Sequence, residues 1–441
     1  MKFARVVPLL CVALFVAPAP RAHAQIKSGT RKRVVSPRTQ ALHDLLVKAK
    51  FEADGKNYAA AQSDYQKYLA ENPDDAAAHF DLGYVFTAQH QTQKAIAEYR
   101  KAIALDPKMM QADLNLGMSL LAENPKQAIQ PLKKAVQLDA SSEPAHFALA
   151  LAEERAGNNS AAQQQYELAL QLAPADANAR AGFARALLAG GKPAAAQRQF
   201  QKLLQLKPDD SQAELGLAQS FIAQKQNAQA SQALAAYLKS NPGDVGEQIT
   251  EASLLFQLGK TTEAISTLDA VAKIAPQNLD AWELRAQICY SQKNWPGAVA
   301  ALQKAAKLAP NDARILAQLG HAFLKSRDYP RAAQQLLRSL QLDGSSSAST
   351  DALRDLVAAE FLGKNYSGTL AALDLLSRRQ PSSAGTWYVR GSCYDHLNHP
   401  RAALDAYEKF LVMNTDKNSN QYFEAAARAR FLKKLLKERS K

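Results

Sequence analysis

Apolar and polar positions in residues 76–107 follow the period of an α-helix in two successive short runs. In residues 76–89, one face carries His79, Leu82, Gly83 and Phe86. In residues 92–105, one face carries Ala95, Ile96, Tyr99, Ala102 and Ile103. Spacings of three and four residues place side chains on the same side of a helix. The pattern therefore predicts two amphipathic helices joined by a short turn.

This pair of predicted helices recurs through residues 42–417 in one register. A small residue stands in each second helix at steps of 33, 34 or 37 residues: Ala61, Ala95, Ala128, Ala162, Ala196, Ala230, Ala264, Ala298, Ala332, Thr369 and Ala403. A large apolar residue follows four positions later, as Tyr99 follows Ala95. A second small residue precedes most of them by twelve positions, as Gly320 precedes Ala332. A register kept over so many copies indicates a repeat array.

Each recurring residue type has a packing reason. A small side chain lets two helices approach closely, and a bulky neighbour fills the remaining space. Proline disfavours the helical conformation in the residue before it, so we expect prolines such as Pro107 to follow the ends of second helices. The acids and amides of 74–75, 209–210 and 311–312 are expected to cap the first helix of the next copy.

The repeats resemble the tetratricopeptide repeat family, whose unit is a helix–turn–helix of about 34 residues. The resemblance implies an all-α fold, a right-handed α-solenoid of about eleven helix–turn–helix repeats whose first helices line a concave groove. The copies begin near residues 42, 76, 110, 143, 177, 211, 245, 279, 313, 350 and 384. The copy at 350–381 is the least typical, because it lacks the small residues and follows the serine-rich segment 344–350.

The first 40 residues are expected to lie outside the solenoid, which we place at 41–417. Residues 1–24 contain Lys2 and Arg5, an apolar run over 6–17 and the sequence Ala-His-Ala at 22–24, the pattern of a cleaved signal peptide. The apolar run is shorter than the roughly 20 residues that span a membrane, so a retained anchor is the less favoured alternative. Residues 25–40 carry five basic and no acidic side chains and are predicted to be a basic disordered arm. The signal indicates an exported protein, periplasmic or secreted.

Residues 418–441 are predicted to form a basic amphipathic helix that caps the last repeat. Its apolar positions are Tyr422, Phe423, Ala426, Phe431, Leu432, Leu435 and Leu436. Seven basic residues of this segment are expected on the other face, against two acidic residues in the whole segment. The last unit of a solenoid needs a cover with a polar outer side, and this helix fits that requirement.

The net charge of +13 belongs to the ends of the chain. Residues 41–417 hold 39 basic and 39 acidic side chains, so the repeats are neutral in total. A surface that follows a phosphate backbone needs a stripe of Lys and Arg, and none is apparent along the repeats. The charge distribution therefore argues against nucleic acid as a partner.

The sequence leaves little room for catalysis or cofactors. The repeats occupy nearly the whole chain, and we find no glycine-rich phosphate loop or nucleophile motif. Cys289 and Cys393 lie three repeats apart, so we expect free buried thiols. Cys393, Asp395, His396 and His399 have spacings that a metal site could use, but His399 lies in a turn. We expect no enzyme activity, no cofactor and no metal.

The predicted first helices carry a second stripe beside the one that packs within each repeat. Phe80 and Tyr84 are four residues apart on this stripe, and the matching residues are Leu114 and Met118, then Phe147 and Leu151. In later repeats the place of Tyr84 is polar, at Arg185, Gln219, Ser253, Gln287, His321 and Ser392. We predict a partner-binding groove formed by Phe80, Tyr84, Leu114, Met118, Phe147, Leu151 and Arg185. For Phe80, Leu114 and Phe147 we favour packing against the first helix of the next repeat, and for Tyr84, Met118 and Leu151 we favour contact with a partner.

These features favour an exported scaffold that binds other proteins or peptides through its concave groove, within a cell-envelope assembly. The alternative is a binding subunit for an exported polysaccharide or another non-protein polymer, which would require aromatic stacking platforms along the groove. Aromatic residues make up 7% of the chain and are sparse at these positions. No stable membrane span is expected after the signal has been removed.

Overall fold

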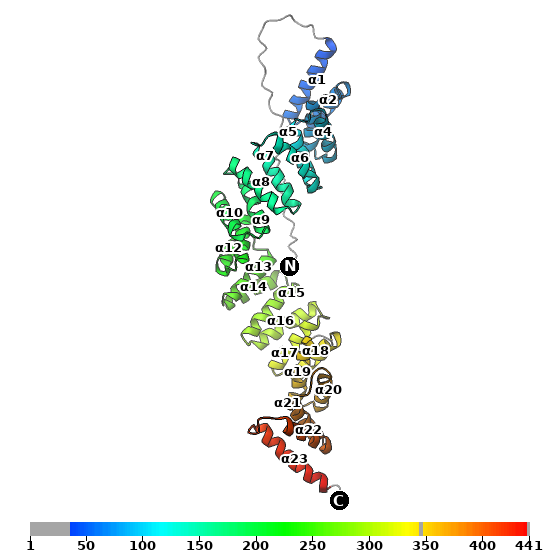
Figure 1. The fold of residues 1–441 in the computed structure, drawn as a ribbon, viewed down its shortest axis with the longest axis vertical. Helices are drawn as coiled ribbons and strands as arrows, with labels where there is room; N and C mark the ends of the chain where they lie inside the picture. Colours follow the sequence, from blue (N-terminus) through cyan, green and yellow to red (C-terminus); the bar gives the residue numbers. More distant parts are fainter. Residues whose placement is uncertain (1–35, 344–346, 439–441) are drawn as a thin grey trace. The chain divides into compact units, whose positions relative to one another are not determined.

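The computed structural model describes residues 36–343 and 347–438, which contain 23 α-helices and no β-strand (Figure 1). The chain divides between Ser240 and Asn241 into two compact units. The helices of the first unit are α1 (Pro37–Asp54), α2 (Tyr58–Glu71), α3 (Ala76–Ala88), α4 (Thr92–Leu105), α5 (Met110–Leu121), α6 (Pro125–Leu138), α7 (Glu143–Arg155), α8 (Asn159–Leu172), α9 (Ala177–Ala189), α10 (Pro193–Leu206), α11 (Ser211–Ala223) and α12 (Asn227–Ser240).

The second unit continues the same alternation of helices. Its helices are α13 (Val245–Gln257), α14 (Thr261–Ile274), α15 (Leu279–Ser291), α16 (Trp295–Leu308), α17 (Ala313–Lys325), α18 (Tyr329–Leu342), α19 (Ser347–Leu362), α20 (Tyr366–Ser377), α21 (Ala384–His396), α22 (Pro400–Met413) and α23 (Asn420–Glu438). Within each unit, odd-numbered helices up to α21 pair with the next even-numbered helix to form hairpins, and consecutive hairpins pack on one another. Each unit is therefore an α-solenoid.

The helix starts agree with the predicted register. From α3 to α17, and again at α21, the first helix of each hairpin begins where the sequence pattern places it. The first copy differs, because α1 begins at Pro37 instead of near residue 42. Ser36 caps this helix through its side chain, and a proline at the first helical position is preorganised for a helix. Residues 37–40 thus belong to α1 and not to the predicted arm. Residues 1–24 and 25–35 lie outside the described residues.

The recurring small residues form the seam inside each hairpin. All ten recurring alanines, and Thr369 in the same register, are 0% exposed. The glycines before them meet bulky side chains: a Cβ atom at Gly83 would lie 2.7 Å from the Tyr99 ring, and one at Gly320 would lie 2.5 Å from Leu336 Cγ. These approaches are closer than carbon atoms tolerate, so the backbone fits only because the side chain is absent. The predicted packing is confirmed at these positions.

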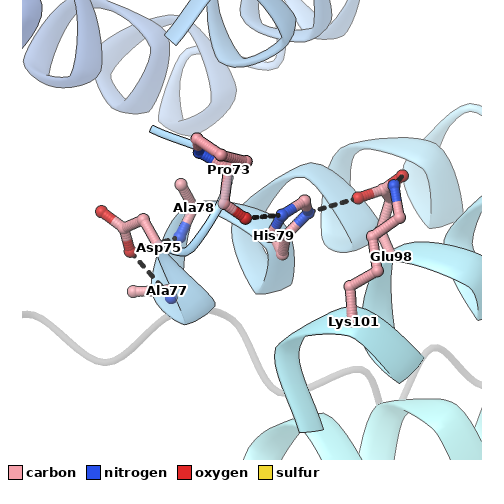
Figure 2. A network of polar contacts seen from close by, with 7 residues as sticks. All are labelled: Pro73, Asp75, Ala77, Ala78, His79, Glu98 and Lys101. Carbon is pink, nitrogen blue, oxygen red and sulfur yellow. Dashed lines mark hydrogen bonds and ion pairs between the residues drawn. The ribbon is translucent and has the colours of Figure 1, made fainter. Parts of the chain in front are cut away.

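Side-chain caps mark the starts of several first helices. Asp75 accepts hydrogen bonds from the backbone N–H groups of Ala77 and Ala78, at 3.0 and 3.1 Å (Figure 2). Asp210 and Asp312 cap α11 and α17 in the same way. These contacts satisfy N–H groups that have no partner within a helix. The caps expected from the sequence are confirmed at all three positions.

A second contact holds the turn between hairpins against the next first helix. In the first turn of α3, His79 Nε2 donates to the carbonyl oxygen of Pro73 at 2.8 Å, and Nδ1 lies close to Glu98 of α4 (Figure 2). Equivalent bonds run to the carbonyl six residues earlier from His146, Arg180, Gln248 and Trp282. We call this contact the turn–helix bond. It ties together a turn, a first helix and, at His79, the following second helix.

The last helix covers the final hairpin, through a face that matches the predicted one only in part: Leu432 is buried and Leu435 packs against the same cluster, as expected. α23 packs on α22 and buries Ala425, Ala429 and Leu432. Phe423 and Phe431, which we expected on the apolar face, are 59% and 52% exposed. The buried residues show the reason, since the small side chains of Ala425 and Ala429, four residues apart, let α23 approach α22 closely.

Candidate functional site

The predicted groove residues divide into buried and accessible sets. Phe80, Leu114 and Phe147 are each 8% exposed or less. Phe80 packs on the Tyr99 ring with centroids 5.8 Å apart, and Phe147 packs on Tyr166 at 6.0 Å. These three side chains therefore belong to the core and are not exposed groove residues.

Tyr84, Met118 and Leu151 are half-buried and keep part of their surface open. Met118 and Leu151 rest against the core of the first unit. Burial raises the pKa of the Tyr84 hydroxyl, and the neighbouring Tyr58 and Asp54 add to the rise. Their contact with a partner stays a prediction.

Arg185, the seventh predicted residue, is held by the preceding hairpin. Its Nε and Nη2 atoms lie 3.0 and 3.3 Å from the two carboxylate oxygens of Glu154, which also accepts a hydrogen bond from Tyr166. The side chain remains 42% exposed. This ion pair fixes the orientation of the guanidinium and offsets its positive charge.

The same register in the second unit contains a hollow of about 560 Å³. It lies on the surface formed by the first helices α15, α17 and α19. Gln287 and His321, which stand in the register of Tyr84, both line it. Ala317 stands where Phe80, Leu114 and Phe147 stand in the first unit, three residues before the small residue of the seam. Its short side chain leaves part of this face unfilled.

Most of the charged groups around this hollow are acidic. Four carboxylates line it, from Asp280, Glu283, Asp351 and Asp355, against the single guanidinium of Arg314. Arg314 already contacts Glu283 and Asp312. We call this feature the acidic hollow. Its wall carries an excess of negative charge that the lining residues do not neutralise.

One side of the acidic hollow is aromatic. The rings of Tyr290 and His321 stack with centroids 6.0 Å apart and planes 29° from parallel. His321 Nδ1 lies 2.7 Å from the Asp355 carboxylate, which fixes the ring. The Tyr290 hydroxyl donates to the Gln318 carbonyl oxygen, and burial followed by the charge of Asp355 raises its pKa. The hollow thus combines a held aromatic face with carboxylate oxygens.

Models of known protein families match residue ranges that contain the helices described above. One model described as tetratricopeptide repeat matches residues 51–109, 86–143 and 249–313, and a second model with this description matches residues 187–248. The chain belongs to the tetratricopeptide repeat family. No curated protein sequence matches it.

Several solved structures are similar to parts of this tetratricopeptide repeat chain. YrrB, described as a tetratricopeptide repeat protein with an unusual peptide-binding site, is 20% identical over 44% of this chain and 97% of its own, with a TM-score of 0.39. PilF of Pseudomonas aeruginosa is 21% identical over 48% and 97%, with a TM-score of 0.40. The Naa15/Naa10 structure bound to HypK-THB is 16% identical over 88% and 66%, with a TM-score of 0.41. These likenesses concern the fold only.

The cluster around Cys393 has structural roles within its repeat. Asp395 binds the guanidinium of Arg428 on α23, with both oxygens at 2.7 Å. His396 stacks on Tyr366 at 4.3 Å. Cys393 is buried and free, and burial raises the pKa of its thiol to about 11, so the thiol stays protonated at neutral pH. Across residues 36–343 and 347–438, no group of three or more His, Cys, Asp and Glu side chains is arranged to hold a metal ion.

A second hollow, of about 430 Å³, lies in the first unit on α4, α5 and α6. It is lined by Arg100, Lys133 and Lys134 together with Asp113. Asp113 is 4% exposed, and its Oδ2 atom has no hydrogen-bond partner. Burial raises the pKa of this carboxyl to about 6, and the nearby Lys134 opposes the rise. An unpaired buried carboxylate destabilises the folded state.

Sequence reasoning identified the register of the acidic hollow but not the hollow itself. His321 and Gln287 appear in the polar series that follows Tyr84 along the repeats. Side-chain volume at the register of Phe80, where α17 carries the small residue Ala317, was not part of the sequence prediction. No helix in the described part of the chain has both the length and the apolar composition needed to cross a membrane.

Proposed function

We propose that this chain is an exported scaffold that binds extended segments of other proteins on its first-helix surface, as part of a cell-envelope assembly. The tetratricopeptide repeat family typically supplies non-catalytic scaffolds for such contacts. The observation that carries the proposal is the acidic hollow. It spans three successive first helices, which is the length of surface that an extended peptide needs for several side-chain contacts.

The export part of the proposal rests on residues 1–24. A basic start, a short apolar run and small residues at positions 22 and 24 are the features by which secretory signals are cleaved. We expect the mature chain to begin at Gln25. Mass spectrometry of the protein recovered from fractionated cells tests this, and recovery of the full-length chain from the cytoplasm would refute it.

Partner binding is tested by placing a photo-crosslinking amino acid at Gln287, which is exposed and lines the acidic hollow. A matched control carries it at Ser266, an exposed residue of α14 outside the hollow. We expect Gln287 adducts in envelope preparations to map to one continuous peptide segment of a partner. Equal labelling from both positions would count against the proposal. Adducts to carbohydrate from Gln287 alone would favour the polysaccharide alternative.

A further inference from the structure

We propose that the acidic hollow selects an arginine side chain in the segment it binds. This inference rests on the proposed function and adds the chemistry of the ligand. It draws on three properties of the hollow that are independent of one another: its unfilled volume, the surplus of carboxylates around it, and the stacked rings of Tyr290 and His321.

The volume admits a long side chain. Leu284, Ala286, Ala317 and Ala352 supply apolar lining between the charged groups. An arginine side chain has an apolar stem and a charged end, so it can cover apolar lining while its guanidinium reaches carboxylates. At this register the first unit buries bulky residues such as Phe80, whereas α17 carries only the methyl group of Ala317.

The carboxylates have capacity for a further donor. The Asp280 side chain makes no ion pair or hydrogen bond within the described residues. Asp355 uses Oδ2 for His321, and its Oδ1 atom is available as an acceptor. Asp351 contacts Arg354 on its own helix but stays 76% exposed. These carboxylates therefore attract a positively charged group of a ligand and repel an anionic ligand.

The aromatic side distinguishes arginine from lysine. A guanidinium is planar, stacks on aromatic rings and donates to carboxylates through a fixed fork of N–H groups, whereas an ammonium is a compact, strongly hydrated charge. Tyr290 and His321 form a stacked aromatic pair at the hollow, and the Asp355 carboxylate lies at the edge of the His321 ring. This arrangement fits a planar guanidinium, which can stack on the aromatic rings and donate hydrogen bonds to the carboxylate.

The test uses the full chain and short labelled peptides of glycine and serine that carry two arginines, two lysines or two citrullines. Citrulline keeps the shape of arginine and removes its charge. Fluorescence anisotropy at low salt is expected to show the arginine peptide binding about tenfold more tightly than the citrulline peptide and severalfold more tightly than the lysine peptide. High salt is expected to remove most of the difference between arginine and citrulline.

Two sets of variants locate the effect. Asp280→Asn with Asp355→Asn removes two carboxylates of the hollow and should weaken the arginine peptide about tenfold while leaving the citrulline peptide unchanged. Glu263→Gln with Asp405→Asn makes the same charge change at exposed positions of α14 and α22, outside the hollow, and should leave both peptides unchanged. Ala317→Phe should block every peptide by filling the hollow. Thermal melts verify that each variant is folded.

The outcomes separate this inference from the proposed function. Equal affinity for arginine and citrulline peptides, both blocked by Ala317→Phe, would overturn arginine selection and leave peptide binding in place. An equal loss in the control pair of variants would overturn the inference by attributing the effect to net charge. Displacement of the arginine peptide by calcium at matched ionic strength would identify a cation site instead. Absence of binding by every peptide, together with no specific adduct at Gln287, would refute both.

Discussion

The Nε2 atom of His79 lies 2.8 Å from the carbonyl oxygen of Pro73, six residues earlier in the chain. Since a carbonyl oxygen only accepts, the imidazole donates, and the turn before α3 is fixed to the first turn of that helix (Figure 2). The other ring nitrogen faces Glu98, which also contacts Lys101 at 2.9 Å. A buried histidine in a first helix thus has a structural role.

We expect His79→Ala to lower the free energy of unfolding of the first unit by about 1–3 kcal/mol, because the Pro73 carbonyl and Glu98 lose a buried partner. His43→Ala changes an exposed histidine of α1 and should shift stability by less than about 0.5 kcal/mol. Denaturant unfolding followed by circular dichroism measures both. Equal effects of the two changes would show that the turn–helix bond contributes nothing.

The seam of small residues predicts a steric cost. Gly320→Leu should destabilise the second unit by about 1–3 kcal/mol or more, because even its Cβ atom would lie 2.5 Å from Leu336 Cγ. Adding Leu336→Ala should recover part of this loss, which a double-mutant cycle detects. Gly243→Ala is the control, since a Cβ atom there meets no atom within 4 Å. A well-tolerated Gly320→Leu would contradict the close packing of α17 on α18.

Asp113 predicts a pH dependence of stability. Its pKa in the folded chain, about 6, is above its ordinary value of 3.8, so the folded state holds the proton more tightly than the unfolded state does. The contribution of Asp113 to stability is therefore fully present below pH 4 and falls as pH rises through about 6. Asp113→Asn should stabilise the first unit by about 1–3 kcal/mol at alkaline pH and have little effect in acid.

Denaturant unfolding of both forms across this pH range measures the Asp113 effect. Asp405→Asn, at an exposed carboxylate of the second unit paired with Lys409, serves as the control and should show no such dependence. A stabilisation by Asp113→Asn that is equal in acid and in alkali would mean that the carboxyl does not titrate as described.

The predicted groove of the first unit gives a test of binding without loss of folding. Tyr84→Ala combined with Met118→Ala should weaken a bound partner by about 1–3 kcal/mol and leave Tm nearly unchanged, because both side chains are half-buried. Phe80→Ala should instead cost about 3–5 kcal/mol of stability, since Phe80 packs on Tyr99 in the core. A large fall in Tm with unaltered partner affinity would assign Tyr84 and Met118 to the core.

Much of the hairpin architecture was readable from sequence because its register is local. Alanines such as Ala95 and Ala264 are recognisable by spacing alone, and their complete burial follows from the meeting of two helices. The role of His79 was not readable, because a polar residue on a packed face gives no sign of which carbonyl it meets. Its acceptor is set by how the turn at Pro73 folds back on the helix.

The surface was harder to predict than the seam. Phe423 and Phe431 are large and apolar, which favours burial, but α23 packs through Ala425 and Ala429 and leaves both rings exposed. The acidic hollow was missed for a related reason. It lies beside the short side chain of Ala317, and an unfilled volume shows only when the neighbouring helices are placed around it.

The hollow and the seam use neighbouring but distinct positions of the same helix, Ala317 and Gly320 of α17. Residues that hold a hairpin together are therefore distinct from residues that shape what it can bind. Exchange of one side chain at the register of Ala317 can open or close a cavity while the alanine and glycine contacts stay intact. Under the proposed function, single substitutions at this register would change binding preference repeat by repeat while the hairpins remain folded.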